Sequence, residues 1–141
     1  MVEFAPALRD HLKPGRYNVI PDDKPAVSLS DVGPFSLLQV AAWPRTVAAT
    51  GRVAAKAAGM SRATGPGTGR AGKSAAMLRV EPLKWWLLAA GENSIPELNL
   101  PSKNGCMLDL SHSRVWLRIE GEKSDILLNR TVRKIKHISV F

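Results

Sequence analysis

The chain has 141 residues, of which 45% are hydrophobic, and a formal net charge of +8 at pH 7. This length suits one domain with a modest core, and the hydrophobic fraction is that of a globular protein, which excludes a disordered chain. The positive charge indicates an anionic partner without identifying it, because a basic surface attracts nucleic acid, acidic lipid and acidic protein alike.

Three sequence features restrict the compartment and the partners. No run approaches the roughly 20 apolar residues that a spanning helix needs, and charged residues interrupt positions 1–15, so we expect a cytoplasmic protein with no membrane partner. Cys106 is the only cysteine, which excludes an intrachain disulfide, and we expect it to be a buried small hydrophobe. The signatures of zinc-finger, RNA-binding and basic-heptad modules are absent, so we expect no nucleic-acid partner.

The N-terminal segment is rich in proline. Prolines at such close spacing exclude a long helix or a central strand. We expect residues 1–34 to form an extended arm, with one short helix near residues 5–12. The arm is too apolar for a free linker, so it is expected to pack on its own domain or on a partner.

A strand and a helix are expected next. Residues 35–42 form an apolar run that predicts a buried strand, and Pro44 suits the first turn of a following helix. Small and apolar residues recur at helical spacing up to Ala58, so the helix should present one such face to a sheet. Gly59 can end it in the left-handed conformation.

Further strand-like runs are expected beyond this helix. A Gly-rich loop over residues 61–73 leads into strand-like runs at 76–80 and 83–89, and the tight connection between these runs predicts a hairpin. After a second Pro-containing loop, residues 106–110 and 114–120 read as strands, the latter with clear alternation of apolar and polar positions.

The last expected element is a short helix over residues 122–129 that buries Ile126 and Leu127. The resulting order is that of a ferredoxin-like split βαβ unit, provided that one more strand closes the sheet. We therefore expect an α+β domain with an antiparallel sheet over residues 35–130. The basic tail, residues 131–141, would supply the closing strand at an edge of the sheet.

Residues 67–74 match the P-loop pattern GxxxxGK(S/T), in which Lys73 and Ser74 would contact phosphate and magnesium. A phosphate cradle needs a buried strand before the loop and a helix N-terminus after it, because free backbone N–H groups bind the anion. Here a helix precedes the loop and residues 77–80 read as a strand. We therefore expect a flexible basic loop that becomes ordered against a partner.

An acid, hydroxyls and an imidazole lie within five residues at Asp109, Ser111, His112 and Ser113. On a strand His112 would point away from the other three, so they cannot form a catalytic triad. We expect them to satisfy backbone groups at a turn or strand end. The three histidines of the chain lie far apart in sequence, so no metal site is expected.

Two adjacent tryptophans follow Lys84. Neighbours on a strand point to opposite faces, so one is expected in the core and the other either covered or exposed as an interface anchor. Burial of both side chains is the alternative. With basic residues of the helix and the Gly-rich loop, the tryptophans complete a set of candidate interface residues: Trp85, Trp86, Arg70, Lys73, Arg45 and Arg52.

Over most of residues 30–130 the sequence resembles the sarcosine oxidase gamma-subunit family. The resemblance rests on residues 33–44, 66–69, 83–88, 109–114 and 127–130. It implies a fold related to the folate-binding domains of the glycine-cleavage T protein. Beyond residue 130 the basic tail departs from the family pattern, so we expect the C-terminal part of the fold to be truncated or replaced.

The resemblance also implies a role. The family's complex oxidises sarcosine to glycine and hydrogen peroxide, and FAD, FMN, NAD and tetrahydrofolate are expected in it but not bound by this chain alone. Alpha, beta and delta subunits are the expected partners. Because the gamma subunit has no assigned catalytic residue, we expect a non-catalytic assembly subunit. The alternatives are a stand-alone folate-binding domain and a P-loop nucleotide binder.

Overall fold

The computed structural model describes residues 8, 10, 11, 13, 27–91 and 95–131. Within them the chain divides into two compact units, each described by itself below. The expected domain of residues 35–130 holds parts of both units. The expected helix near residues 5–12 and the expected strand in the basic tail lie largely outside the described residues.

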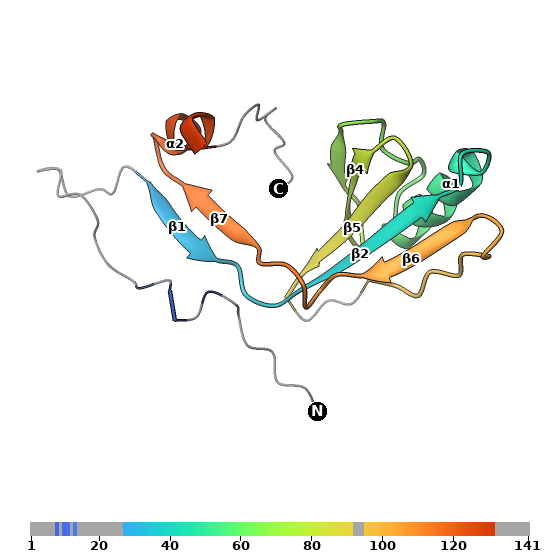
Figure 1. Ribbon diagram of the computed structural model, residues 1–141, viewed down its shortest axis with the longest axis horizontal. Coiled ribbons are helices and arrows are strands. Elements are labelled where there is room, and N and C mark those ends of the chain that lie inside the picture. The colour runs from blue at the N-terminus through green and yellow to red at the C-terminus, as the bar shows by residue number, and fades with distance from the viewer. Residues whose placement is uncertain (1–7, 9, 12, 14–26, 92–94, 132–141) are drawn as a thin grey trace, which may run out of the picture. The chain divides into compact units, whose positions relative to one another are not determined.

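The larger unit is built on a five-stranded sheet with one helix (Figure 1). Its elements are β2 (Phe35–Ala42), α1 (Val47–Ala57), β3 (Gly69–Ala71), β4 (Ala76–Glu81), β5 (Lys84–Ala90) and β6 (Gly105–Asp109). The strands lie in the order β3-β4-β5-β2-β6, and every neighbouring pair is antiparallel. The expected α+β class with an antiparallel sheet is thus confirmed.

Local sequence signals explain most of these elements. The apolar run forms β2 with the predicted bounds, and the β4–β5 hairpin forms where two apolar runs meet at a tight connection. Helix α1 begins at Val47 rather than at Pro44, because residues 44–46 form a turn in which the Thr46 N–H donates to the Trp43 carbonyl oxygen at 2.9 Å. Gly59 ends the helical segment with a φ of 72°, as predicted.

Two features of the sheet differ from the expectation. The strand that lies beside β2 on the side away from β5 is β6, a pairing that the sequence did not predict. A short strand, β3, forms inside the Gly-rich loop and pairs with β4 at the edge of the sheet. Three residues that include a glycine carry no periodic signal, so sequence patterns do not detect such a strand.

The core lies between α1 and one face of the sheet. Val40, Trp85 and Leu87 are almost completely buried there, at 0%, 1% and 0% exposure, and they pack with Ala54 of the helix. Gly51 lets the helix approach the sheet, since a Cβ atom at this position would lie 3.3 Å from the Trp85 ring. The small residues of α1 therefore serve close packing of a large aromatic side chain.

In the smaller unit, β1 (Ser28–Asp31) pairs with β7 (Leu117–Glu120), and α2 (Ser124–Thr131) follows β7. Strand β1 lies in the proline-rich segment that was expected to form an extended arm, and its pairing with β7 was not predicted. The predicted burial of Ile126 and Leu127 is wrong, because these side chains are 46% and 39% exposed. Two strands and one short helix offer too few apolar neighbours to bury a helix face.

The sheet face opposite α1 carries a row of side chains across four strands. Leu78 pairs with Trp86, Trp86 with Gln39, and Gln39 with Leu108. These residues alternate with the core residues, so they point away from the helix. The Trp86 indole donates to Gln39 Oε1 at 3.2 Å, and Leu108 is 54% exposed. This face thus presents apolar surface at its β6 edge.

Candidate functional site

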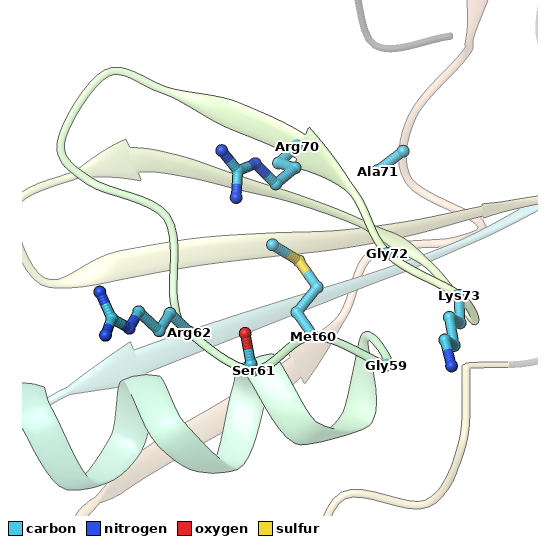
Figure 2. Close-up of a pocket in the computed structure, with 8 residues that line it drawn as sticks. All are labelled: Gly59, Met60, Ser61, Arg62, Arg70, Ala71, Gly72 and Lys73. Carbon is cyan, nitrogen blue, oxygen red and sulfur yellow. The ribbon is translucent and has the colours of Figure 1, made fainter.

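A basic pocket of about 490 Å³ lies between the end of α1 and the connection from β3 to β4 (Figure 2). Two short segments line it, residues 59–62 after the helix and residues 70–73 of the Gly-rich loop. Figure 2 shows the Arg62 and Arg70 side chains extending to the same side of the pocket, with Met60 between them, whereas Lys73 lies apart from them and extends downward in this view.

The two walls of the pocket are held together by backbone contacts. The Ala58 carbonyl oxygen accepts hydrogen bonds from the N–H groups of Ser74 at 3.2 Å and Ala75 at 3.4 Å. The Gly72 N–H donates to the Ala75 carbonyl oxygen at 3.0 Å. A Cβ atom on Gly72 would lie only 2.0 Å from the Ala58 oxygen, so the loop fits against the helix end only with glycine there. The backbone of the pocket is therefore well defined.

The described residues that line the pocket carry only positive charges. Arg62, Arg70 and Lys73 are all exposed, and no carboxylate is found among the lining residues. None of the three makes an ion pair within the part of the chain that the structure describes. Like charges held on two fixed segments repel one another, and an anion placed between them relieves that repulsion.

The P-loop letters have a structural explanation here. Lys73 and Ser74 lie in the turn between β3 and β4 and start no helix, which confirms that the order of elements is reversed relative to a phosphate cradle. Gly67 adopts a φ of 67° in a turn, and Gly72 is required by its contact with the helix end. The donors of Gly72 and Ser74 are occupied by backbone oxygens. A nucleotide phosphate would therefore find few free backbone N–H groups.

The acidic and hydroxyl groups after β6 brace the backbone. The Asp109 carboxylate accepts from the Ser111 hydroxyl at 2.6 Å and from the Ser111 N–H at 2.9 Å. The Ser111 hydroxyl oxygen in turn accepts from the Leu37 N–H at 3.0 Å, and the Ser113 hydroxyl donates to the Leu110 carbonyl oxygen at 3.1 Å. These bonds match the predicted backbone-satisfying role and attach the turn to β2.

These contacts give Asp109 a lowered pKa. The hydrogen bond from the Ser111 hydroxyl is the main cause, followed by the Ser111 N–H and the nearby charge of His112. A group whose pKa is lowered by folding contributes stability above its ordinary pKa and loses this contribution as the pH falls through the lowered value. The Asp109–Ser111 contact should therefore stabilise the fold at neutral pH and not in strong acid.

Replacing Ser111 by alanine is expected to lower the free energy of unfolding by about 1 kcal/mol at neutral pH. Part of this loss should disappear as the pH falls from the ordinary pKa of an aspartate, about 4, toward the lowered pKa of Asp109. Urea unfolding at pH 7 and pH 3 measures both effects. Ser113→Ala is the matched control, because its hydroxyl bonds a carbonyl oxygen and its loss should not vary with pH. Equal losses for Ser111→Ala at both pH values would contradict the prediction.

The tryptophans divide between the two faces of the sheet, as predicted. Trp85 lies in the core, where its indole N–H donates to the Thr64 carbonyl oxygen at 3.4 Å and the Arg79 guanidinium lies 4.9 Å from the ring centre. Its inclusion among the interface residues is corrected, because a side chain with 1% exposure is not available to a partner. Trp86, half-buried and bonded to Gln39, stays a predicted interface residue.

The remaining predicted interface residues separate into two places. Arg70 and Lys73 lie together in the basic pocket. Arg45 and Arg52 are exposed near the start of α1 and within it, and they do not line this pocket. Arg62 was not among the predicted interface residues, because its position near Arg70 depends on the unpredicted strand β3. No local signal marks it.

Cys106 lies at the surface and not in the core. The expected burial of Cys106 is wrong: it is exposed, because β6 is the last strand of the sheet. Among residues 27–91 and 95–131 and the few described before them, no group of three His, Cys, Asp or Glu side chains is placed to hold a metal ion. No helix in the described ranges is long and apolar enough to cross a membrane.

The fold and the site define a small α+β protein with antiparallel sheets and a basic pocket at a sheet edge. Neither a protein-family model nor a curated protein matches the sequence. Among solved structures, the fold is similar to a chain of the heterotetrameric sarcosine oxidase from Corynebacterium sp. U-96, determined in complex with pyrrole 2-carboxylate. The TM-score is 0.59 and the identity 24%, over 79% of this chain and 58% of that chain. This chain therefore spans less than two thirds of its structural neighbour.

Proposed function

We propose that this chain is a non-catalytic assembly subunit of a sarcosine-oxidase-type complex, with the role of the gamma subunit. The observation that carries the proposal is the fold shared with a chain of heterotetrameric sarcosine oxidase over 79% of this chain. The motif resemblance to the gamma-subunit family over residues 30–130 supports the same assignment from the sequence. In this proposal the alpha, beta and delta subunits are the partners, in the cytoplasm.

We further propose that the larger unit is a ferredoxin-like arrangement related to the folate-binding domain of the glycine-cleavage T protein. Its support is the element order β2, α1, β4, β5, β6, with β5 inserted between β4 and β2 and with β6 on the other side of β2. The unit departs from the full pattern between β5 and β6, where the described residues 95–104 form no helix.

In this proposal FAD, FMN, NAD and tetrahydrofolate bind to other subunits. Some side chains of this chain suggested a catalytic triad or a P-loop. They have structural uses instead, which supports a non-catalytic role. Asp109 and Ser111 brace a turn against β2, and the loop of Lys73 and Ser74 packs on the end of α1. These residues would thus contribute to the complex by stabilising the fold that presents a surface to the partner subunits.

The sheet face opposite α1 is the proposed contact surface. Leu108 is 54% exposed at the β6 edge, in the same cross-strand row as Trp86 and Leu78. Exposed apolar surface of this kind is typical of protein interfaces, and aromatic residues within it are enriched among energetically important contacts. Another subunit of the complex is the proposed occupant, since the structural neighbour is a chain of a heterotetramer.

The test is co-expression of the tagged chain with the alpha, beta and delta subunits of a heterotetrameric sarcosine oxidase. Native mass spectrometry of the purified material should find the chain in a complex with the larger subunits. Leu108→Glu should weaken this association at least about tenfold, because a charge placed in an apolar contact loses its hydration. Its neighbour Met107 is 42% exposed and points to the α1 side of the sheet, so Met107→Glu is the matched control.

Three outcomes would contradict the proposal. The first is a wild-type chain that purifies alone, and the second is an equal weakening of the association by the two variants. The third is turnover of a substrate by the isolated chain. A chain that purifies alone and binds tetrahydrofolate would instead favour the stand-alone folate-binding domain. Circular dichroism of each variant checks that the fold is retained, so that a loss of association reflects the surface and not unfolding.

A further inference from the structure

We propose that the basic pocket between the end of α1 and the β3–β4 connection binds carboxylate side chains of an acidic segment in a partner subunit. This inference rests on the proposed function, which supplies the partner. It concerns a different surface from the sheet face of Leu108. The described lining residues contribute three cations, Arg62, Arg70 and Lys73, and no acid.

The chemistry of the donors favours carboxylates. Two of the three cations are arginines, whose planar guanidinium groups bind carboxylates through two parallel hydrogen bonds. Arg62 and Arg70 extend to the same side of the pocket, and Lys73 lies at its other end (Figure 2). Charges distributed in this way suit several acidic groups along a segment better than one compact anion.

The backbone of the pocket argues against a phosphate ligand. Phosphate sites in proteins use clusters of free backbone N–H groups. Here the N–H groups of Gly59, Met60 and Gly72 donate to the carbonyl oxygens of other residues, at 3.0, 2.8 and 3.0 Å, and that of Ser74 donates to the Ala58 oxygen. These four N–H groups are therefore not available to an anion, whereas the cationic side chains are exposed.

The exposure of these cations argues for a macromolecular partner. Small-molecule sites are usually concave and enclose most of their ligand. Arg62, Arg70 and Lys73 are instead all exposed at the surface. They lie in or near β3, which is an edge strand of the sheet that the described residues form. A protein segment can contact all three cations at once. Because hydrogen bonds fix the backbone of the pocket, this chain loses little conformational entropy on binding.

The first measurement is the affinity of the full chain for fluorescein-labelled hexaglutamate, by fluorescence anisotropy at low salt. Arg62→Glu/Arg70→Glu should bind the peptide at least about tenfold more weakly than the wild type. Lys103→Glu/Arg114→Glu is the matched control, because both residues are exposed and outside the pocket and the change in net charge is the same. The control should stay within about threefold of the wild type, since distant exposed charges are screened.

Two results of this measurement would overturn the inference. Equal weakening by both double variants would mean that only net charge attracts the peptide. Tighter binding of tripolyphosphate than of hexaglutamate, with competition between them, would mean that the pocket is a phosphate site. Circular dichroism of both variants is expected to match the wild type, because all four substituted side chains are exposed.

The second measurement separates this inference from the proposed function. The same double variants are co-expressed with the alpha, beta and delta subunits, and their incorporation is quantified by native mass spectrometry. If the wild type assembles and Arg62→Glu/Arg70→Glu assembles as well as the control, the inference is overturned and the proposed function stands. If the wild type binds hexaglutamate but does not assemble, the proposed function falls together with the identity of the partner, and carboxylate binding by the pocket stands.

Discussion

Trp85→Ala is expected to lower the free energy of unfolding by about 3–5 kcal/mol, the usual cost of emptying a large aromatic site in a core. Trp85 is 1% exposed and packs between the sheet and α1. The variant also loses the hydrogen bond from the Trp85 indole to the Thr64 carbonyl oxygen and the contact of the Arg79 guanidinium with the ring. Because small domains are stable by only about 5–15 kcal/mol, this one substitution should remove a large part of the total.

Urea unfolding followed by far-UV circular dichroism measures this loss, since the other tryptophans complicate fluorescence. Trp86→Ala is the matched control: it is the same change on the adjacent residue, but its side chain is only half-buried on the opposite face. Its expected cost is about 2 kcal/mol or less. A larger loss for Trp86 than for Trp85 would mean that the helix-covered side of the sheet is not the main core.

Gly72→Ala is the second substitution with a large expected effect, a loss of about 3 kcal/mol. The added Cβ atom would lie 2.0 Å from the Ala58 carbonyl oxygen and 2.8 Å from the Ala75 oxygen. Neither oxygen can move independently of the backbone, so the loop must shift. The shift breaks the hydrogen bonds that Ser74 and Ala75 donate to Ala58.

Thermal unfolding compares this variant with Gly65→Ala, a glycine in the same loop. A Cβ atom on Gly65 would have Thr68 Oγ1 as its nearest neighbour, at an ordinary 3.7 Å, so the expected change is within about 0.5 kcal/mol. Similar stability of the two variants would disprove the close contact at the helix end. A large difference would show that the second glycine of the P-loop pattern serves packing.

The predicted elements that formed where expected share one property: their signal is local. The apolar run of β2, the helical spacing before Gly59 and the break between β4 and β5 each lie within about a dozen residues. Side-chain periodicity and turn chemistry act over such distances, so they are visible without knowledge of the partners. The backbone-bracing role of Asp109 and Ser111 followed for the same reason, because alternation along a strand excludes a triad.

The candidate site shows why other features could not be predicted from the sequence. Arg70 and Lys73 were recognised as basic loop residues, but Arg62 was not, because it approaches them only through the pairing of β3 with β4. The core position of Trp85 and the half-buried position of Trp86 were equally undecided in sequence. Alternation places the two side chains on opposite faces, and only the packing of α1 determines which face is covered.

The sequence by itself therefore determined the α+β class, the bounds of β2, the β4–β5 hairpin and the absence of a phosphate-cradle order around Lys73. Tertiary structure alone decided that β6 lies beside β2, that β1 pairs with β7, and that three cations meet at one pocket. The physical reason is that strand pairing forms backbone hydrogen bonds between remote segments. Those bonds use groups that every residue carries, so the side-chain pattern of either segment does not specify its partner.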